Sequence, residues 1–126
     1  MSVRQFLDNH ITHTYGATAE YPWASAPSYG VYRHSHNKKW FAVIMDIPAS
    51  KLGLENDEII SIVNLKCDPI LIGSLHKDNG IYPAYHMNKR HWISVLLGGS
   101  VPMDFTERLI EKSYDLTDKK RKISAK

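Results

Sequence analysis

The most informative stretch for the fold is "IYPAYHMNKRHWISVLL", residues 81–97. Two segments rich in aromatic and β-branched residues flank a polar centre that holds Asn88, Lys89 and Arg90. That pattern is typical of a β-hairpin. In the second segment, alternation places Trp92 and Leu96 on one face of the strand and residues 93, 95 and 97 on the other. The stretch therefore predicts two adjacent antiparallel strands.

The rest of the chain predicts further strands and three helices. Strands are expected in "AEYPW", "SYGVYRH" and "KWFAVIMDI" within residues 19–47, and in "EIISIVNLK" at 58–66. Helices are expected at residues 2–14, 69–77 and 103–116. Ser2 and Gly16 are plausible cap and stop signals, Asp68 caps the second helix, and Asp104 with Glu107 resembles a capping box for the third.

These elements follow the order α-β-β-β-β-α-β-β-α. Adjacent hairpins favour an antiparallel sheet, so the predicted fold is α+β in two layers. A sheet of five to six strands would carry its helices on one face. Residues 1–118 form a single expected domain, and residues 119–126 are an expected basic, loosely ordered tail.

Composition places the chain among ordinary globular proteins. Of its 126 residues, 43% are hydrophobic and 23% are charged. No apolar run approaches the roughly 18 residues that a membrane span needs. The first ten residues lack an apolar signal core, and Cys67 is the single cysteine, which favours a reducing compartment. We therefore expect a cytoplasmic protein with no membrane association.

Charge is distributed unevenly along the chain. The net charge is +3, but no acidic residue lies between Glu20 and Asp46 or between Asp78 and Asp104. Each acid-free interval contains a similar turn, "YRHSHNKKW" at residues 32–40 and "YHMNKRHW" at residues 85–92. Repeated basic turns favour an anionic partner. The alternative is that hairpin tips are polar anyway and that these charges only keep the protein soluble.

Three segments resemble the MmcQ/YjbR family. They are "VNLKCDP" (63–69), "YPAYHMNKRHWISV" (82–95) and "SYDL" (113–116), and their order and spacing also match. The resemblance implies an α+β fold similar to type III secretion chaperones, without an established activity. It also implies DNA binding through a "double wing", in which two β-hairpins flank a nucleic-acid-facing surface. Residues 32–40 lie in the family's variable part, so the resemblance supports their role less.

The predicted site is a set of cations and histidines at the two turns. It comprises Lys89, Arg90, His86, His91, Arg33, Lys38 and Lys39. These side chains are expected to contact phosphates of DNA or RNA, with an accessory role for the basic tail. The tail residues are Lys119, Lys120, Arg121 and Lys122. In the competing interpretation the second turn is merely solvated, and Asn88 supplies its unusual backbone angle.

No metal, cofactor or catalytic site is predicted. His34 with His36, and His86 with His91, are pairs that could bind a metal, but no cysteine or carboxylate stands beside them. Cys67 precedes a helix N-terminus, where a thiol pKa can fall, although an inert structural thiol is favoured. No nucleophile elbow or glycine-rich phosphate loop is present in the sequence.

The sequence therefore predicts a non-catalytic DNA-binding protein. Two other classes stay open: a protein-interaction or chaperone-like module, including a homodimer, and a small-ligand site. The latter would lie under the second hairpin and be lined by Tyr82, His86 and Trp92. Trp40 and Trp92 are expected to pack in the core rather than to stack on bases. The deciding question is whether the two basic turns lie on one surface.

Overall fold

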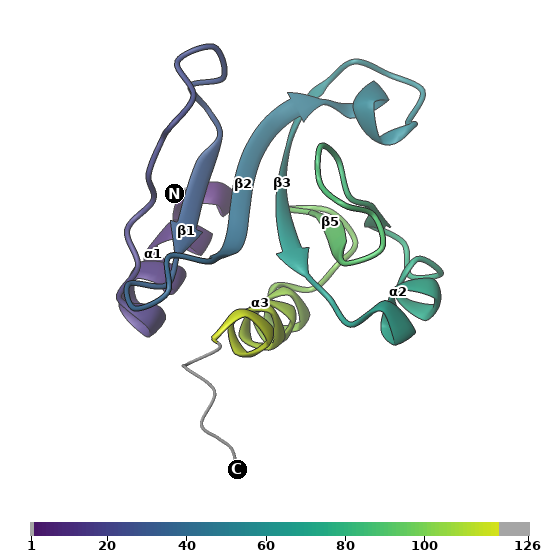
Figure 1. Ribbon diagram of the computed structural model, residues 1–126. Coiled ribbons are helices and arrows are strands. Elements are labelled where there is room, and N and C mark those ends of the chain that lie inside the picture. Colours follow the sequence, from purple (N-terminus) through teal and green to yellow (C-terminus); the bar gives the residue numbers. More distant parts are fainter. Residues whose placement is uncertain (1, 119–126) are drawn as a thin grey trace.

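The computed structural model describes residues 2–118, which form one five-stranded sheet with helices against it (Figure 1). The strands are β1 (Gly30–Arg33), β2 (Trp40–Pro48), β3 (Ile59–Lys66), β4 (Ile81–Pro83) and β5 (Trp92–Leu96). The helices are α1 (Val3–Tyr15), the 3-10 helix η1 (Ala49–Leu52), α2 (Pro69–Leu75) and α3 (Met103–Thr117). All neighbouring strands are antiparallel, in the order β1-β2-β3-β5-β4, which confirms the predicted α+β fold.

One predicted strand does not form. The segment "AEYPW" makes only an isolated bridge, from Glu20 to Val31. Pro22 cannot donate to a ladder, and the Trp23 side chain instead packs on the sheet beside Trp40. The element order is therefore α-β-β-β-α-β-β-α, with one strand fewer before α2 than the sequence suggested.

The two faces of the sheet are covered differently. On one face, strand residues such as Ile44 and Val63 pack against Leu7 of α1 and Ile110 of α3, and α2 adds Ile72 to the same cluster. The α-helices thus lie on one face, as predicted. The other face is also apolar and is covered mainly by loop side chains. Those side chains are Trp23, Tyr29 and Tyr85, and Leu52 of η1 adds to them. Because β2 is buried on both faces, its run of apolar residues is continuous.

Local capping explains where the helices begin. The Ser2 hydroxyl accepts the Gln5 N–H at 3.0 Å, and the Asp68 carboxylate accepts the Ile70 N–H at 3.0 Å. Both caps agree with the sequence prediction. The predicted capping box of α3 is wrong, because Pro102 occupies the N-cap position and Asp104 is the second residue of the helix.

Strand register brings the two basic turns to the same end of the sheet. Ala42 near the start of β2 pairs with Leu65 near the end of β3, and Lys66 pairs with Trp92 at the start of β5. The turn at residues 34–39 leads into β2, and the turn at 84–91 leads into β5. Both turns and the end of β3 therefore meet at one end, called the basic end below.

Candidate nucleic-acid interface

The two basic turns share one construction. In the first, the Asn37 side-chain oxygen accepts the Lys39 N–H at 2.9 Å; in the second, the Asn88 oxygen accepts the Arg90 N–H at 2.8 Å. An asparagine that bonds to the backbone two residues later forms an Asx turn. Each turn consequently places two cations directly after its asparagine, so the similarity in sequence corresponds to a similarity in structure.

The backbone strain does not lie at the asparagines. Positive φ angles occur at Lys38 (65°) and His86 (61°). The interpretation that Asn88 supplies the unusual backbone angle is therefore wrong, because its contribution is the side-chain hydrogen bond to the backbone of Arg90.

Four cations at these turns are open to solvent. Lys38 and Lys39 in the first turn and Lys89 and Arg90 in the second are all exposed. The Lys89 ammonium also donates to the Ala84 carbonyl at 2.9 Å, which holds the lysine stem across its own turn. The geometry leaves both pairs able to reach a phosphate from the same end of the sheet.

Arg33 differs from the other predicted cations. Its guanidinium forms an ion pair with Glu20 at 2.9 Å, across the isolated bridge that joins the N-terminal loop to β1. No acidic residue lies between Glu20 and Asp46 in the sequence, but the fold places the Glu20 carboxylate next to Arg33. Arg33 is therefore neutralised by a neighbouring carboxylate, whereas the four turn cations are exposed.

The two predicted histidines of the second turn have separate environments. His86 is exposed, and its ring lies against Tyr85 with centroids 4.0 Å apart. His91 is half-buried at the base of the turn, where its carbonyl accepts the Cys67 N–H at 2.8 Å. His91 lines a hollow at the basic end, and His86 lines another hollow over the loop-covered face.

Lys66 lies between the two turns. A hollow of about 390 Å³ at the basic end is lined by residues of both turns, β3, α2 and α3. Its lining residues are Lys39, Lys66, Cys67, Asp68, Pro69, His91, Leu116 and Thr117. The Lys66 ammonium lies 5.7 Å from the centre of the Trp92 ring, a cation–π distance. Sequence reasoning missed Lys66, although the strand register would have placed it between the turns.

A buried polar network holds the second turn. The Tyr85 N–H donates to the Ser94 hydroxyl at 2.9 Å, this hydroxyl donates to the Asn64 side-chain oxygen at 2.5 Å, and the Asn64 amide donates to the Tyr85 carbonyl at 2.8 Å. Asn64 and Ser94 are fully buried. The closed ring of three bonds ties the start of the turn to two central strands.

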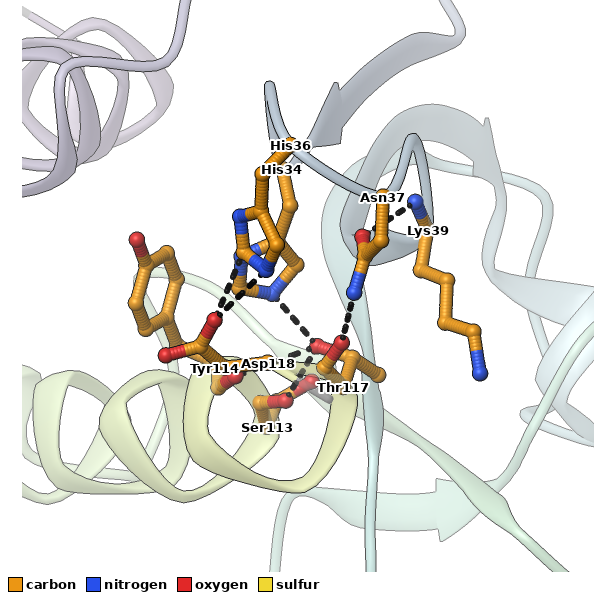
Figure 2. A network of polar contacts seen from close by, with 8 residues as sticks. All are labelled: His34, His36, Asn37, Lys39, Ser113, Tyr114, Thr117 and Asp118. Carbon is orange, nitrogen blue, oxygen red and sulfur yellow. Dashed lines mark hydrogen bonds and ion pairs between the residues drawn. The ribbon is translucent and has the colours of Figure 1, made fainter. Parts of the chain in front are cut away.

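The first turn is held by α3 instead (Figure 2). The Asn37 amide donates to the Thr117 carbonyl at 2.9 Å, and a ring nitrogen of His34 lies 2.8 Å from the Thr117 hydroxyl. One turn earlier in α3, the Ser113 hydroxyl donates to the Phe41 carbonyl and accepts the Lys66 N–H. The end of α3 is thereby bonded to β2, β3 and the first turn.

A carboxylate stands beside the histidines of the first turn. The Asp118 Oδ1 atom lies 2.9 Å from His36 Nε2 and 3.8 Å from His34 Nδ1. No carboxylate neighbours these histidines in the sequence, and for that reason no metal site was expected there. In the fold, α3 ends against the turn and brings Asp118 beside them. Burial, more than any neighbouring charge, lowers the pKa of His34.

The remaining candidates are the two tryptophans, Cys67 and the expected ligand pocket. Trp92 is buried and Trp40 half-buried against the sheet, as expected of core residues. Cys67 is buried, and burial raises the pKa of its thiol, which favours the structural interpretation. A hollow beside the second hairpin includes His86 but is otherwise lined by residues such as Trp23, Tyr29 and Met87, rather than by Tyr82 and Trp92.

Two further expectations concern the ends of the chain and the membrane. The accessory tail, residues 119–122, lies outside the described residues. Between residues 2 and 118, none of the helices combines the length and the apolar character that crossing a bilayer requires.

The fold and the anchored turns define a small α+β protein whose antiparallel sheet carries its helices on one face and a cluster of cations at one end. The chain belongs to the YjbR family, whose model matches residues 12–116. The sequence resemblance to this family is therefore confirmed.

Similar proteins extend over nearly the whole chain. Protein YyaQ of Bacillus subtilis is 41% identical over 117 residues, which cover 93% of this chain and 99% of YyaQ. A crystal structure of a Pseudomonas syringae protein is 47% identical, has a TM-score of 0.89 and covers 93% of this chain and 99% of its own. A Deinococcus radiodurans protein of the DUF419 family is 25% identical with a TM-score of 0.62, over 82% of this chain and 70% of its own.

Proposed function

We propose that this protein binds DNA without catalysis, by contacting backbone phosphates with the basic end of its sheet. The observation that carries the proposal is the meeting of the two Asx turns at one end, with Lys66 between them. Four exposed cations and a fifth at the hollow form one positive surface. Phosphate contacts of this kind position a protein on nucleic acid but carry little sequence information.

Three acids near this surface have partners, while a fourth, Asp115, is exposed and lines a pocket with Lys66. Glu20 pairs with Arg33, Asp118 lies within ion-pair distance of His36, and the Asp68 carboxylate accepts the Ile70 N–H as a helix cap. Glu20 is thereby offset by Arg33, whereas Asp68 stays exposed and lines the hollow beside Lys66. The four turn cations outnumber the exposed acids Asp68 and Asp115 at this end, which favours a polyanion.

The number of cations sets the expected strength of binding. Each neutralised phosphate contributes about 0.9 to the slope of log K against log salt on duplex DNA, so four contacts predict a slope of about −3.6. Affinity should therefore be weak at physiological salt and fall steeply as salt is added. Little difference between duplex sequences is expected, since few groups are placed to read bases.

Fluorescence anisotropy with a labelled duplex, measured across a salt series, tests the proposal. The variants Lys38→Ala/Lys39→Ala and Lys89→Ala/Arg90→Ala should each weaken binding and each flatten the salt slope by about 1.8. The matched control is Lys51→Ala/Lys77→Ala. It removes the same charge from exposed sites near the opposite end of the sheet and should leave the slope close to that of the wild type.

Two results would overturn the proposal. One is the absence of wild-type binding at about 50 mM salt, where phosphate contacts are strong. The other is an equal effect of the control pair, which would mean that net charge matters and the basic end does not. Single-stranded DNA and RNA of equal length, run in parallel, show which nucleic acid binds best.

A second candidate function is contact with another protein through α2. Ile70 is 86% exposed and Leu71 41% exposed, and Leu71 also borders an apolar pocket of about 460 Å³ between α2 and α3. Exposed apolar groups beside a pocket are typical of interaction surfaces. If a second copy of the chain covers them, sedimentation should show a dimer that Ile70→Lys dissociates. A wild-type monomer at high concentration would exclude that homodimer.

A further inference from the structure

Two histidines and an aspartate converge where the first basic turn meets the end of α3 (Figure 2). His34 directly follows β1, His36 lies in the turn, and Asp118 is the C-cap residue of α3. Each offers one ligand atom, and these three atoms lie within 4.8 Å of one another. Elements from opposite ends of the chain therefore present two imidazole nitrogens and a carboxylate oxygen to one point.

The hydrogen bonds of Thr117 favour one tautomer of His34. The Thr117 hydroxyl donates its only proton to a carbonyl of its own helix, that of Ser113 at 2.8 Å or that of Tyr114 at 3.2 Å. The same oxygen lies 2.8 Å from His34 Nε2 and, while its own proton is held by one of these carbonyls, it accepts a proton from that nitrogen. In neutral His34 this arrangement has the proton on Nε2, and Nδ1 carries a lone pair.

That lone pair is buried and faces a negative atom. The His34 side chain is 0% exposed, and its Nδ1 has no hydrogen-bond partner among residues 2–118. The nearest acidic atom is Asp118 Oδ1 at 3.8 Å, which is too far for a hydrogen bond. Two acceptors that face each other repel, and a buried polar atom without a partner is costly. A cation between them would satisfy both.

The spacing of the three atoms suits a small divalent ion. Zinc bonds of about 2.0–2.2 Å to nitrogen and oxygen in a tetrahedron place neighbouring ligand atoms about 3.3 Å apart. The observed separations from Asp118 Oδ1, 2.9 Å to His36 and 3.8 Å to His34, lie on either side of that value. The three atoms together lie within 4.8 Å of one another, so the exposed His36 ring would turn inward to complete the coordination. The donor set of two imidazoles and one carboxylate is typical of zinc and of neighbouring transition metals rather than of calcium or magnesium.

We propose that His34 Nδ1, His36 Nε2 and a carboxylate oxygen of Asp118 bind a divalent transition-metal ion, with zinc as the best match. Thr117 orients His34 from behind, as outer hydrogen-bond partners of metal-bound histidines generally do. His36 is exposed, so the fourth position of the ion faces solvent and takes a water. The ion would clamp the first basic turn to α3, beside the existing bond from Asn37 to Thr117.

The test is to measure zinc binding to the full-length, tag-free chain by isothermal titration calorimetry. The wild type should bind one zinc ion per chain. His36→Ala and Asp118→Asn should each weaken binding at least tenfold, because losing even an outer hydrogen-bond partner of a ligand costs about 10–100-fold. Both changes are at sites that are not fully buried, so the variants should fold. His13→Ala, which removes an exposed histidine of α1, is the matched control and should bind zinc as the wild type does.

A second measurement distinguishes a built site from adventitious surface binding. Cobalt(II) added to the wild type should give the intense visible absorption of tetrahedral coordination, and His36→Ala should lose it. The proposal is overturned if the wild type takes up no zinc, or if His36→Ala and Asp118→Asn bind it as tightly as the His13→Ala control. In that case the contact between His36 and Asp118 only fastens the turn to the end of α3. The result does not depend on whether the protein binds DNA.

Discussion

Replacement of Ser94 by alanine would test how the second basic turn is held. The Ser94 hydroxyl accepts the Tyr85 N–H and donates to the Asn64 side-chain oxygen, and it is fully buried. Alanine removes both bonds without changing the β5 backbone. Of the three bonds in the ring, only the one from the Asn64 amide to the Tyr85 carbonyl would then remain.

The cost follows from the atoms left without partners. The substitution strands one backbone N–H and one amide oxygen, and a buried unsatisfied group costs about 1–3 kcal/mol. Partial access of water to the half-exposed Tyr85 reduces the first of these. We therefore expect the free energy of unfolding to fall by about 2–4 kcal/mol in total. For a chain of this length that corresponds to a drop in Tm of about 10 °C.

Urea unfolding followed by tryptophan fluorescence and circular dichroism measures this change. The control is Ser61→Ala on the neighbouring strand β3. The Ser61 hydroxyl donates to Asp46 at 2.7 Å, but the side chain is half-exposed and water can replace that bond. The control should cost less than about 1 kcal/mol.

A double-mutant cycle sharpens the test. If the bonds act as one ring, Ser94→Ala combined with Asn64→Ala should cost less than the sum of the two single changes, by about 0.5–3 kcal/mol. Strictly additive costs would refute the ring, and so would a loss from Ser94→Ala no larger than that from the control.

Three further outcomes are expected. Ser113→Ala should lower the free energy of unfolding by about 2–4 kcal/mol, because it leaves the Phe41 carbonyl of β2 and the Lys66 N–H of β3 without a partner. Urea unfolding measures this loss, and a value below about 1 kcal/mol would contradict the expectation. Cys67 in the folded protein should alkylate more slowly than a free thiol at about pH 8.5, since burial raises its pKa and leaves less thiolate; denaturant should abolish the difference. Arg33→Ala should leave the salt slope of DNA binding unchanged because Glu20 neutralises Arg33, whereas Lys39→Ala should flatten it by about 0.9.

The features predicted correctly from the sequence depend on short-range physics. Alternation in residues 92–97 assigned Trp92 and Leu96 to one face and Ile93 to the other, and the two clusters confirm that Ile93 and Leu96 lie on opposite faces. The caps at Ser2 and Asp68 were predictable because each involves a neighbour two or three residues away. Aromatic residues misled the prediction at "AEYPW", since they signal burial as well as strands, and here burial is achieved by a loop.

The features that the sequence did not predict are contacts between distant residues. Intervals free of acid along the chain suggested uncompensated charge, but Glu20 pairs with Arg33 and Asp118 with His36. Lys66 escaped notice because its importance depends on register, which places the end of β3 between two turns that lie far apart in sequence. A local window contains none of this information, because the pairing of β2 with β3 and of β3 with β5 determines it.

The anchoring of the turns separates structural residues from functional candidates within the family-like segments. Asn64, Ser94 and Ser113 occur in those segments, and each is buried with hydrogen bonds that hold backbone in place. Their presence is therefore explained by the fold and is no argument for binding. Lys89 and Arg90 are different, because they are exposed at the tip of a turn that buried bonds hold firmly. A rigid support for exposed charge lowers the entropy lost when a ligand binds, and on that ground these two cations carry the functional argument.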